Sequence, residues 1–93
     1  MAKYIYSLVI EEWNERPGDG YERMEVRASF GTFKKALRYT RALIDNMLKS
    51  PYADYEIVDD RSLHEYYNPC FAELRLPDTG LHIQYIIVTN QLM

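Results

Sequence analysis

Apolar and polar residues alternate over the first thirty positions in a way that predicts two β-strands. Residues 3–13 are rich in Tyr, Ile and Val, which favour strands. Residues 21–30 carry an apolar side chain at every second position: Met24, Val26, Ala28 and Phe30. Residues 14–20 contain a Pro-Gly and an Asp-Gly pair, both of which favour turns. We therefore expect an antiparallel hairpin.

The register of this hairpin follows from matching the apolar faces of its two strands. Pairing Ile10 with Met24 brings the other apolar residues together: Leu8 with Val26, Tyr6 with Ala28, and Tyr4 with Phe30. On the other face the same register places Glu11 opposite Arg23, an opposite-charge pair that stabilises a sheet. Met24 and Val26 are therefore expected to face the core.

Residues 33–48 have the apolar spacing of an amphipathic helix. At about 100° per residue, their core-facing side chains fall within an arc of roughly 140°. These residues are Phe33, Ala36, Leu37, Thr40, Leu43, Ile44, Met47 and Leu48. The opposite arc is charged and holds Lys34, Arg38, Arg41, Asp45 and Lys49. Thr32 is expected to cap the helix start, and Pro51 ends the helix because it disfavours helical geometry at Ser50.

The second half of the chain predicts three more strands. Residues 52–59 indicate a short strand, and residues 60–69 indicate a loop with at most one helical turn. Residues 70–76 and 81–89 are joined by Pro-Asp-Thr-Gly, which suits a four-residue hairpin loop. Pairing Leu76 with Leu81 builds one apolar face from Leu74 with Ile83, Ala72 with Tyr85, and Cys70 with Ile87. The other face then has Arg75 opposite His82, Glu73 opposite Gln84, and Phe71 opposite Ile86.

These elements predict one α+β domain over residues 1–93, with the order ββαβββ. One amphipathic helix packs on a mostly antiparallel sheet of four to five strands. Two arrangements fit this order: a meander with the helix across one face, and a β-grasp-like sheet with the first and last strands parallel in its centre. The first and last strands are long and apolar on both sides, which favours central positions for both.

One helix covers only one face of the sheet, so apolar residues on the other face need another cover. These interface candidates are Ile5, Val9, Phe71, Ile86 and Val88. Three covers remain open: the segment 60–69, a strong curl of the sheet itself, or a second protein chain. If that chain is another copy, the protein is a homodimer, and Phe71→Asp or Ile86→Asp should give a folded monomer.

Charge is unevenly distributed. Residues 32–50 have five basic residues against one acidic residue, a net charge of +4, whereas the rest of the chain has six against thirteen, a net charge of −7. Of the thirteen aromatic residues, nine are Tyr, a residue type enriched at contact surfaces. No apolar run approaches the roughly 18 residues of a membrane helix. The N-terminal run is too short and too quickly acidic for a signal peptide, so we expect a cytoplasmic protein.

Catalytic and metal-binding motifs are missing from the sequence. The two histidines, His64 and His82, have no metal-ligand spacing with other ligand types, so we expect no metal and no cofactor. The single cysteine, Cys70, points into the core in the expected register, where a thiol is inert. The neighbouring carboxylates Asp59 and Asp60 point to opposite faces of a strand and form no acid–base pair. An enzyme is therefore not expected.

We expect a non-enzymatic protein-binding module. Small acidic domains of this kind are common among the inhibitors that phages and mobile elements direct at host proteins, such as anti-CRISPR proteins. Candidate charged contacts are Lys34, Arg38 and Arg41 on the helix, and Asp54, Glu56, Asp59 and Asp60 after it. One alternative is a small-ligand-binding or enzymatic domain with a site between subunits. The other is nucleic-acid binding through the basic helix face, which the acidic remainder disfavours.

Overall fold

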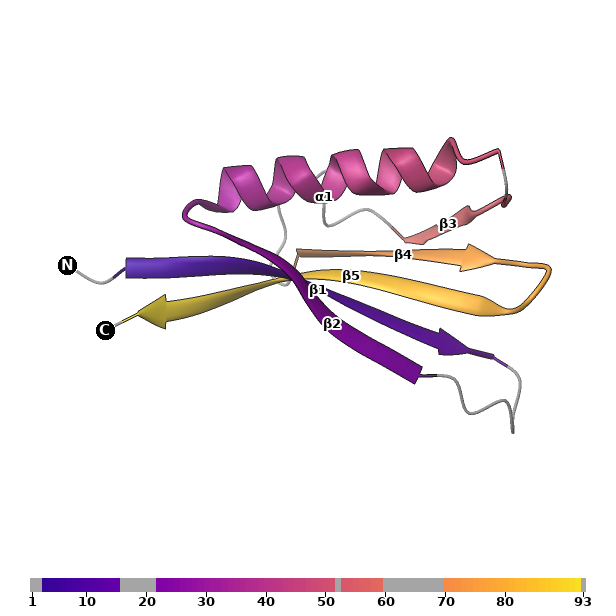
Figure 1. The fold of residues 1–93 in the computed structure, drawn as a ribbon, viewed down its shortest axis with the longest axis horizontal. Helices are drawn as coiled ribbons and strands as arrows, with labels where there is room; N and C mark the ends of the chain where they lie inside the picture. Colours follow the sequence, from indigo (N-terminus) through magenta and orange to yellow (C-terminus); the bar gives the residue numbers. More distant parts are fainter. Residues whose placement is uncertain (1–2, 16–21, 52, 60–69, 93) are drawn as a thin grey trace.

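The computed structural model describes residues 3–15, 22–51, 53–59 and 70–92. Within them lie five strands and one helix: β1 (Lys3–Asn14), β2 (Glu22–Phe30), α1 (Phe33–Leu48), β3 (Glu56–Asp59), β4 (Cys70–Leu76) and β5 (Leu81–Leu92). The predicted α+β class, with one helix on an antiparallel sheet, is confirmed (Figure 1). The segment 60–69, and Asp60 with it, lies outside the described residues.

The strands form one sheet in the order β2-β1-β5-β4-β3, and every neighbouring pair is antiparallel. The predicted central positions of β1 and β5 are confirmed, but these strands are not parallel, so the β-grasp-like arrangement is wrong. Each element along the chain reverses direction, α1 included, and β5 therefore runs opposite to β1 (Figure 1). The structure has the other expected arrangement, an antiparallel sheet with the helix across one face, and α1 carries the chain from one edge strand, β2, to the other, β3.

The hairpin of β4 and β5 has the predicted register at all seven pairs, from Leu76 opposite Leu81 to Cys70 opposite Ile87. Its turn is closed by the backbone N–H groups of Thr79 and Gly80, which both donate to the carbonyl oxygen of Leu76. Gly80 has a φ of 74°, a conformation that glycine adopts without the penalty other residues have. The turn sequence and the alternation of the strands therefore agree on one register.

The predicted register of β1 and β2 is wrong. Leu8 pairs with Ala28, and the next residue, Val9, pairs with Val26, so β2 has one extra residue between these pairs. On the far side of such a bulge, the residues of the strand face the opposite side of the sheet from the one that regular alternation predicts. Val26 and Met24 therefore lie on the side away from the core, with exposed fractions of 65% and 69%. Regular alternation could not reveal the bulge, because no glycine or other local signal marks it.

The strand predicted over residues 52–59 is also shorter than expected, since β3 spans only Glu56–Asp59. Its first pair is Glu56 with Arg75, one residue before the end of β4 at Leu76. The partner strand turns away directly after that position, so residues 53–55 have little strand to pair with.

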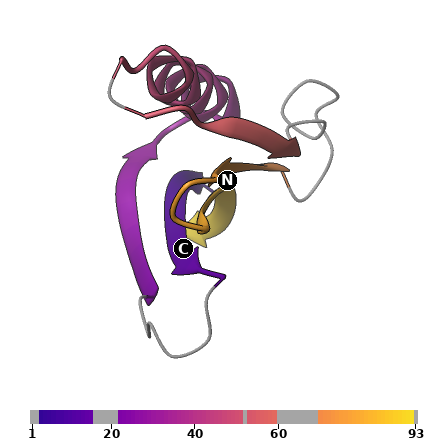
Figure 2. The same cartoon turned by 90° about the vertical axis from the view of Figure 1, so that its right-hand side faces the viewer.

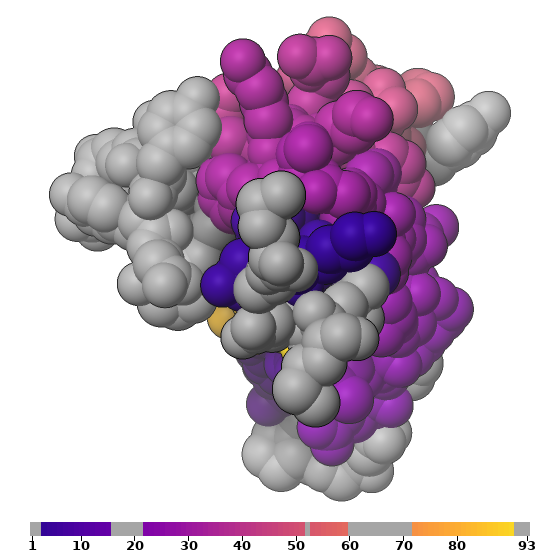
Figure 3. All heavy atoms as spheres, turned by 90° about the vertical axis from the view of Figure 1, so that its left-hand side faces the viewer, coloured from indigo at the N-terminus to yellow at the C-terminus, as the bar shows by residue number. Residues whose placement is uncertain are grey.

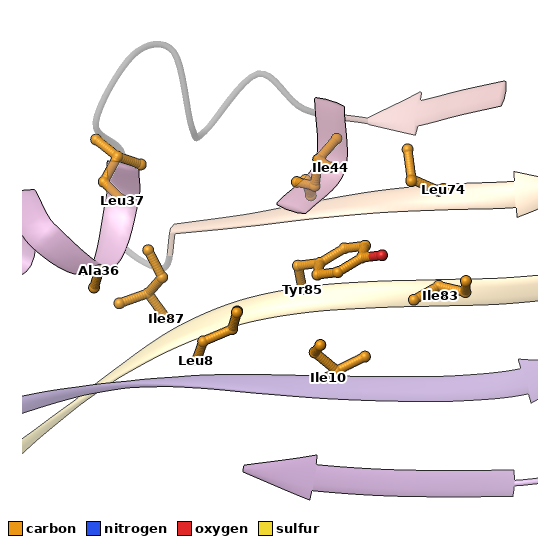
Figure 4. Packing of buried hydrophobic residues seen from close by; sticks show 10 residues of the cluster. Leu8, Ile10, Ala36, Leu37, Ile44, Leu74, Ile83, Tyr85 and Ile87 are labelled. Carbon is orange, nitrogen blue, oxygen red and sulfur yellow. The ribbon is translucent and has the colours of Figure 1, made fainter. Parts of the chain in front are cut away.

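The core lies between α1 and the central strands. Leu8, Leu74 and Ile83 are buried against the helix residues Leu37 and Ile44, and the labelled side chains converge between the two layers (Figure 4). The predicted apolar arc of the helix is confirmed, since all its residues are either buried or packed on this cluster.

The predicted cap of α1 is confirmed as well. The Thr32 hydroxyl accepts a hydrogen bond from the backbone N–H of Lys35, which satisfies one of the free donors at the helix start. Inside the helix, the buried Thr40 hydroxyl donates to the carbonyl oxygen of Ala36 at 2.8 Å, so this polar group has a partner.

Helix α1 lies on one side of the twisted sheet (Figure 2). On the other side, which we call the open face, the structure places no helix or strand of the described residues. Because side chains alternate along strands, the residues between the core positions belong to this face. They are Ile5, Ser7, Val9, Glu11 and Trp13 of β1; Glu22, Met24 and Val26 of β2; His82, Gln84, Ile86 and Val88 of β5; Glu73 and Arg75 of β4; and Glu56 of β3.

Candidate functional site

The first half of the open face is apolar. Val26, Val9 and Ile86 are direct cross-strand neighbours on β2, β1 and β5, and Phe71 of β4 holds the next position in the same row. We call these four positions the apolar row. Val9 and Ile86 are half-buried, whereas Val26 is largely exposed. Cross-strand neighbours lie about 5 Å apart, so the side chains of Val26, Val9 and Ile86 form one continuous surface.

Four of the five predicted interface residues share this face. Val88 is 37% exposed and lies beside Ser7, and Ile5 is half-buried beside Asn90, both on the side of the apolar row away from the charged residues. The fifth, Phe71, has the predicted place in the register, but its side chain lies outside the described set. Sequence reasoning missed Met24 and Val26, because the bulge that turns them outward has no local signal.

The second half of the open face is charged, and we call it the polar end. The Arg75 guanidinium donates to both carboxylate oxygens of Glu15, from Nε to Oε1 at 2.6 Å and from Nη2 to Oε2 at 3.2 Å. Its Nη1 donates to Glu56 Oε1 at 3.0 Å. Bidentate arginine–carboxylate pairs of this kind are among the stronger charge-assisted hydrogen bonds. The Arg75 guanidinium thus connects the end of β1 to β4 and β3.

His82 joins the same cluster from β5. Its Nε2 lies 2.6 Å from Glu15 Oε1, and its Nδ1 lies 2.9 Å from Glu73 Oε2. The protonated ring satisfies both contacts by donating from both nitrogens. The ring also stacks on Trp13, with centroids 5.2 Å apart and planes 6° apart.

These contacts shift the protonation of the cluster. The hydrogen bonds from Arg75 and His82 lower the pKa of the Glu15 carboxyl from 4.5 to about 2. Burial lowers the pKa of His82, but its hydrogen bonds to Glu15 and Glu73 outweigh this effect, and the net pKa lies above the usual 6.5. Glu15 also raises the pKa of the Arg75 guanidinium, with Glu56 adding to that effect. The contacts therefore favour the charged forms of Glu15, Arg75 and His82.

The sequence reveals only part of this cluster. Arg75 was predicted beside His82 on the outer face, and that placement is confirmed. Glu15 falls within residues 14–20, which the sequence predicts as a turn. Its place depends on β1 lying next to β5, which brings Trp13 opposite His82 and allows the Glu15 N–H to donate to the Gly80 carbonyl at 2.9 Å. Such a long-range pairing has no sequence signal within either segment.

A pocket of about 340 Å³ adjoins the polar end, between β1 and β2. Its walls come from Glu11, Glu12, Trp13, Glu22, Arg23, Met24 and Gln84. Two cross-strand pairs frame it on the open face: Glu11 opposite Met24, and Trp13 opposite Glu22. Three carboxylates, the Arg23 guanidinium and the apolar groups of Trp13 and Met24 therefore line one hollow.

The charged-contact candidates lie in separate places. Lys34, Arg38 and Arg41 share one face of α1, where with Leu37 they line a hollow of about 210 Å³ on the opposite side of the molecule from the open face. The acidic candidates do not form a matching group, because Asp54 is exposed outside the sheet, Asp59 is half-buried in β3, and Glu56 is held by Arg75. Asp60 lies outside the described residues.

The His82 imidazole and the Tyr85 phenol are both restrained by their surroundings. Both nitrogens of His82 are already bound to carboxylates, and burial raises the pKa of Tyr85 to about 12, which keeps that phenol neutral. Among the described residues, no three His, Cys, Asp or Glu side chains are grouped to hold a metal ion. The helix these residues form is too short and too polar to cross a membrane.

Strand β2 forms one edge of the sheet, and its residues line one border of the molecule below the helix (Figure 3). On the helix side of this strand, Glu25 pairs with Arg23 at 3.1 Å and with Arg27 at 2.9 Å. A bulge and a run of charges are two devices that hinder an edge strand from pairing with another strand. The bulge and the charges thus hinder pairing of another strand at the β2 edge.

Comparison of the chain with protein-family models, with curated proteins and with solved structures gives no match.

Proposed function

We propose that this protein is a non-enzymatic protein-binding module whose open face takes a partner segment with both apolar and basic side chains. The observation that carries the proposal is the apolar row lying directly beside the polar end. Val26 and Met24 are among the most exposed large apolar side chains of the described residues, although the fold has a helix that covers the other face. Contiguous exposed apolar surface of this kind is typical of interaction sites.

Charge supports the basic character of the partner. The polar end and the pocket beside it present six carboxylates against three basic groups, Arg23, Arg75 and His82. The carboxylates are those of Glu11, Glu12, Glu15, Glu22, Glu56 and Glu73. An excess of carboxylates attracts a basic partner, steers its approach and repels acidic ones. The basic face of α1 points the opposite way and does not neutralise this excess.

Size is also compatible with binding. Four strands about 4.8 Å apart, each with about nine residues rising about 3.3 Å, give a face of roughly 19 by 30 Å. Stable interfaces bury about 800 Å² of accessible surface on each partner. A pleated face of these dimensions, with protruding side chains, approaches that area.

Selection from a random peptide library against the immobilised protein tests the proposal. Selected sequences are expected to combine Lys or Arg with apolar residues. Val26→Lys should weaken binding of these peptides about tenfold or more, because it removes apolar surface and adds repulsion. The matched control is Ala42→Lys, which adds the same charge at an exposed position on α1 and should change affinity less than twofold.

Three outcomes contradict the proposal. Selected sequences could be acidic; the two lysine variants could weaken binding equally; or the wild-type chain could form a dimer through the open face tightly enough to exclude peptides, which sedimentation at high concentration would reveal. Inhibition of a host protein, as in phage-type inhibitors, is the narrower form of the proposal. It requires that a partner found through the selected motif lose activity with the wild-type protein and keep it with Val26→Lys.

A further inference from the structure

We propose that the pocket between β1 and β2 holds one Arg or Lys side chain of the bound partner. This inference rests on the proposed function and assigns the contact that gives the partner's basic residues a defined place. The volume of about 340 Å³ is near the lower limit for small-molecule sites, which run from roughly 300 to 1,000 Å³. It therefore suits one long side chain better than a whole metabolite.

The walls of the pocket match the two parts of such a side chain. The cross-strand pairs place Glu11 and Glu22 at opposite corners of a four-residue square, with Met24 and Trp13 at the other two corners. The aliphatic stem can pack on the thioether and the indole, while the charged head lies between the carboxylates. Aromatic rings also attract cations directly, and Arg more often than Lys.

The two carboxylates differ from their neighbours on the open face. Glu15 and Glu73 are held by the cations of the polar end, and on the helix side Glu25 is held by two arginines. Glu11 and Glu22 form no hydrogen bond or ion pair within the part of the chain that the structure describes. Arg23 also lines the pocket, but its guanidinium pairs with Glu25 at 3.1 Å. A cation from outside would therefore meet two acceptors that the described residues leave available.

A bare metal ion fits this geometry poorly. Diagonal positions on neighbouring strands are about 7–8 Å apart, and no three His, Cys, Asp or Glu side chains of the described residues are grouped to supply the several oxygen ligands that a hard cation needs. A planar guanidinium, with donors on both sides, spans such a separation better. The ligand class is therefore an extended organic cation, and the partner's basic side chain is the source that the adjoining apolar row favours.

Trp13 allows a direct test, because it is the only tryptophan in the chain. Nα-acetyl-arginine amide, added at millimolar concentration and constant ionic strength, is expected to change the indole fluorescence with saturation. The citrulline analogue, which has nearly the same shape but no charge, should leave it unchanged. Glu11→Gln and Glu22→Gln should each weaken the arginine compound up to about fivefold, in the range of exposed ion pairs. Asp78→Asn, the same change in the exposed β4–β5 turn, is the matched control and should have no effect.

A second arm uses the library-selected peptides and separates this inference from the proposed function. Replacing one Arg of a peptide by citrulline should weaken its binding to the wild-type protein but not to Glu11→Gln/Glu22→Gln. If no single citrulline has this effect and the arginine compound leaves Trp13 unchanged, the pocket assignment is wrong, while sensitivity to Val26→Lys would still support the proposed function. If free spermidine binds more tightly than every peptide, a free amine is the ligand and the assignment to a partner's side chain is overturned.

Discussion

The two faces of the same sheet carry comparable apolar residues but are covered differently. On the helix side, Leu8 and Leu74 are fully buried and Ile83 is 3% exposed. On the open face, Val26 is 65% exposed and Val88 is 37% exposed. Burial of a large aliphatic side chain stabilises a fold by about 1.5–3 kcal/mol, so the helix side contributes most of the stability. The exposed apolar residues of the open face contribute less to folding.

The open face is itself divided. The polar end forms its own contacts, since Arg75 and His82 each bind two carboxylates. The side chains of the apolar row, by contrast, form no ion pairs on the described part of the open face. Surface ion pairs contribute only modestly to stability, so the polar end orders the side chains more than it stabilises the fold. An ordered charged rim beside an apolar centre is the usual anatomy of a protein interface.

Truncating one apolar side chain on each face should give the largest difference in the free energy of unfolding. Leu8→Ala should lower the free energy of unfolding by about 2–5 kcal/mol, because it leaves a cavity under the helix. Val26→Ala should change it by less than about 0.5–1 kcal/mol, because that side chain is mostly in solvent already. Urea unfolding of both variants measures the two values. Equal losses would mean that the open face is covered and belongs to the core.

The turn that supports the polar end should show an intermediate effect. Gly80→Ala forces alanine into a positive φ and should cost about 1 kcal/mol or more. Its carbonyl also accepts the Glu15 N–H, so the strain reaches the residue that binds Arg75. The control is Gly31→Ala, where the added methyl meets no atom within 4 Å and φ is not positive. Thermal unfolding should separate the variants; equal stability would contradict the strained turn.

The pH dependence of the polar end should be the smallest effect. The folded pKa of His82 is raised, so its stabilising contribution is complete below about pH 6.5 and is lost as pH rises through the folded value. The Glu15 pKa is lowered to about 2, so its contribution is present above about pH 4.5 and is lost as pH falls toward 2. The stability difference between wild type and His82→Gln should therefore be greatest at pH 4.5–6.5.

Measuring that difference at pH 5.5 and pH 8.5 isolates the histidine, since Glu15 and Arg75 keep their charges over this interval. A difference that is the same at both pH values would mean that the ring does not hold a proton between Glu15 and Glu73. A larger difference at pH 8.5 would reverse the sign and contradict the two hydrogen bonds.

The sequence predicts those parts of the fold in which local and long-range signals agree. The β4–β5 register follows from a turn that allows one loop length and from two strands that alternate without interruption. Helix α1 follows from a cap at Thr32 and an unbroken apolar arc. The central positions of β1 and β5 follow from apolar residues on both of their sides.

Two features of the candidate site could not be predicted from the sequence, for different reasons. The bulge at Arg27 depends on the fit between β1 and β2, and it moves Val26 and Met24 to the open face although their alternation is regular. The polar end depends on the pairing of β1 with β5, which joins Glu15 to His82 across 67 positions. Strand order is set by packing of the whole domain, and neither segment alone indicates it.

Methyl NMR of the labelled protein, titrated with a library-selected basic peptide, tests the central claim most directly, because methyl groups report on each face of the sheet separately. The account predicts that the methyl signals of Met24, Val26, Val9 and Ile86 shift with saturation, while those of Leu8, Ile83 and Ile44 stay nearly constant. Saturating shifts confined to Ala42 and its neighbours on α1, with the open-face methyl groups unchanged, would contradict it.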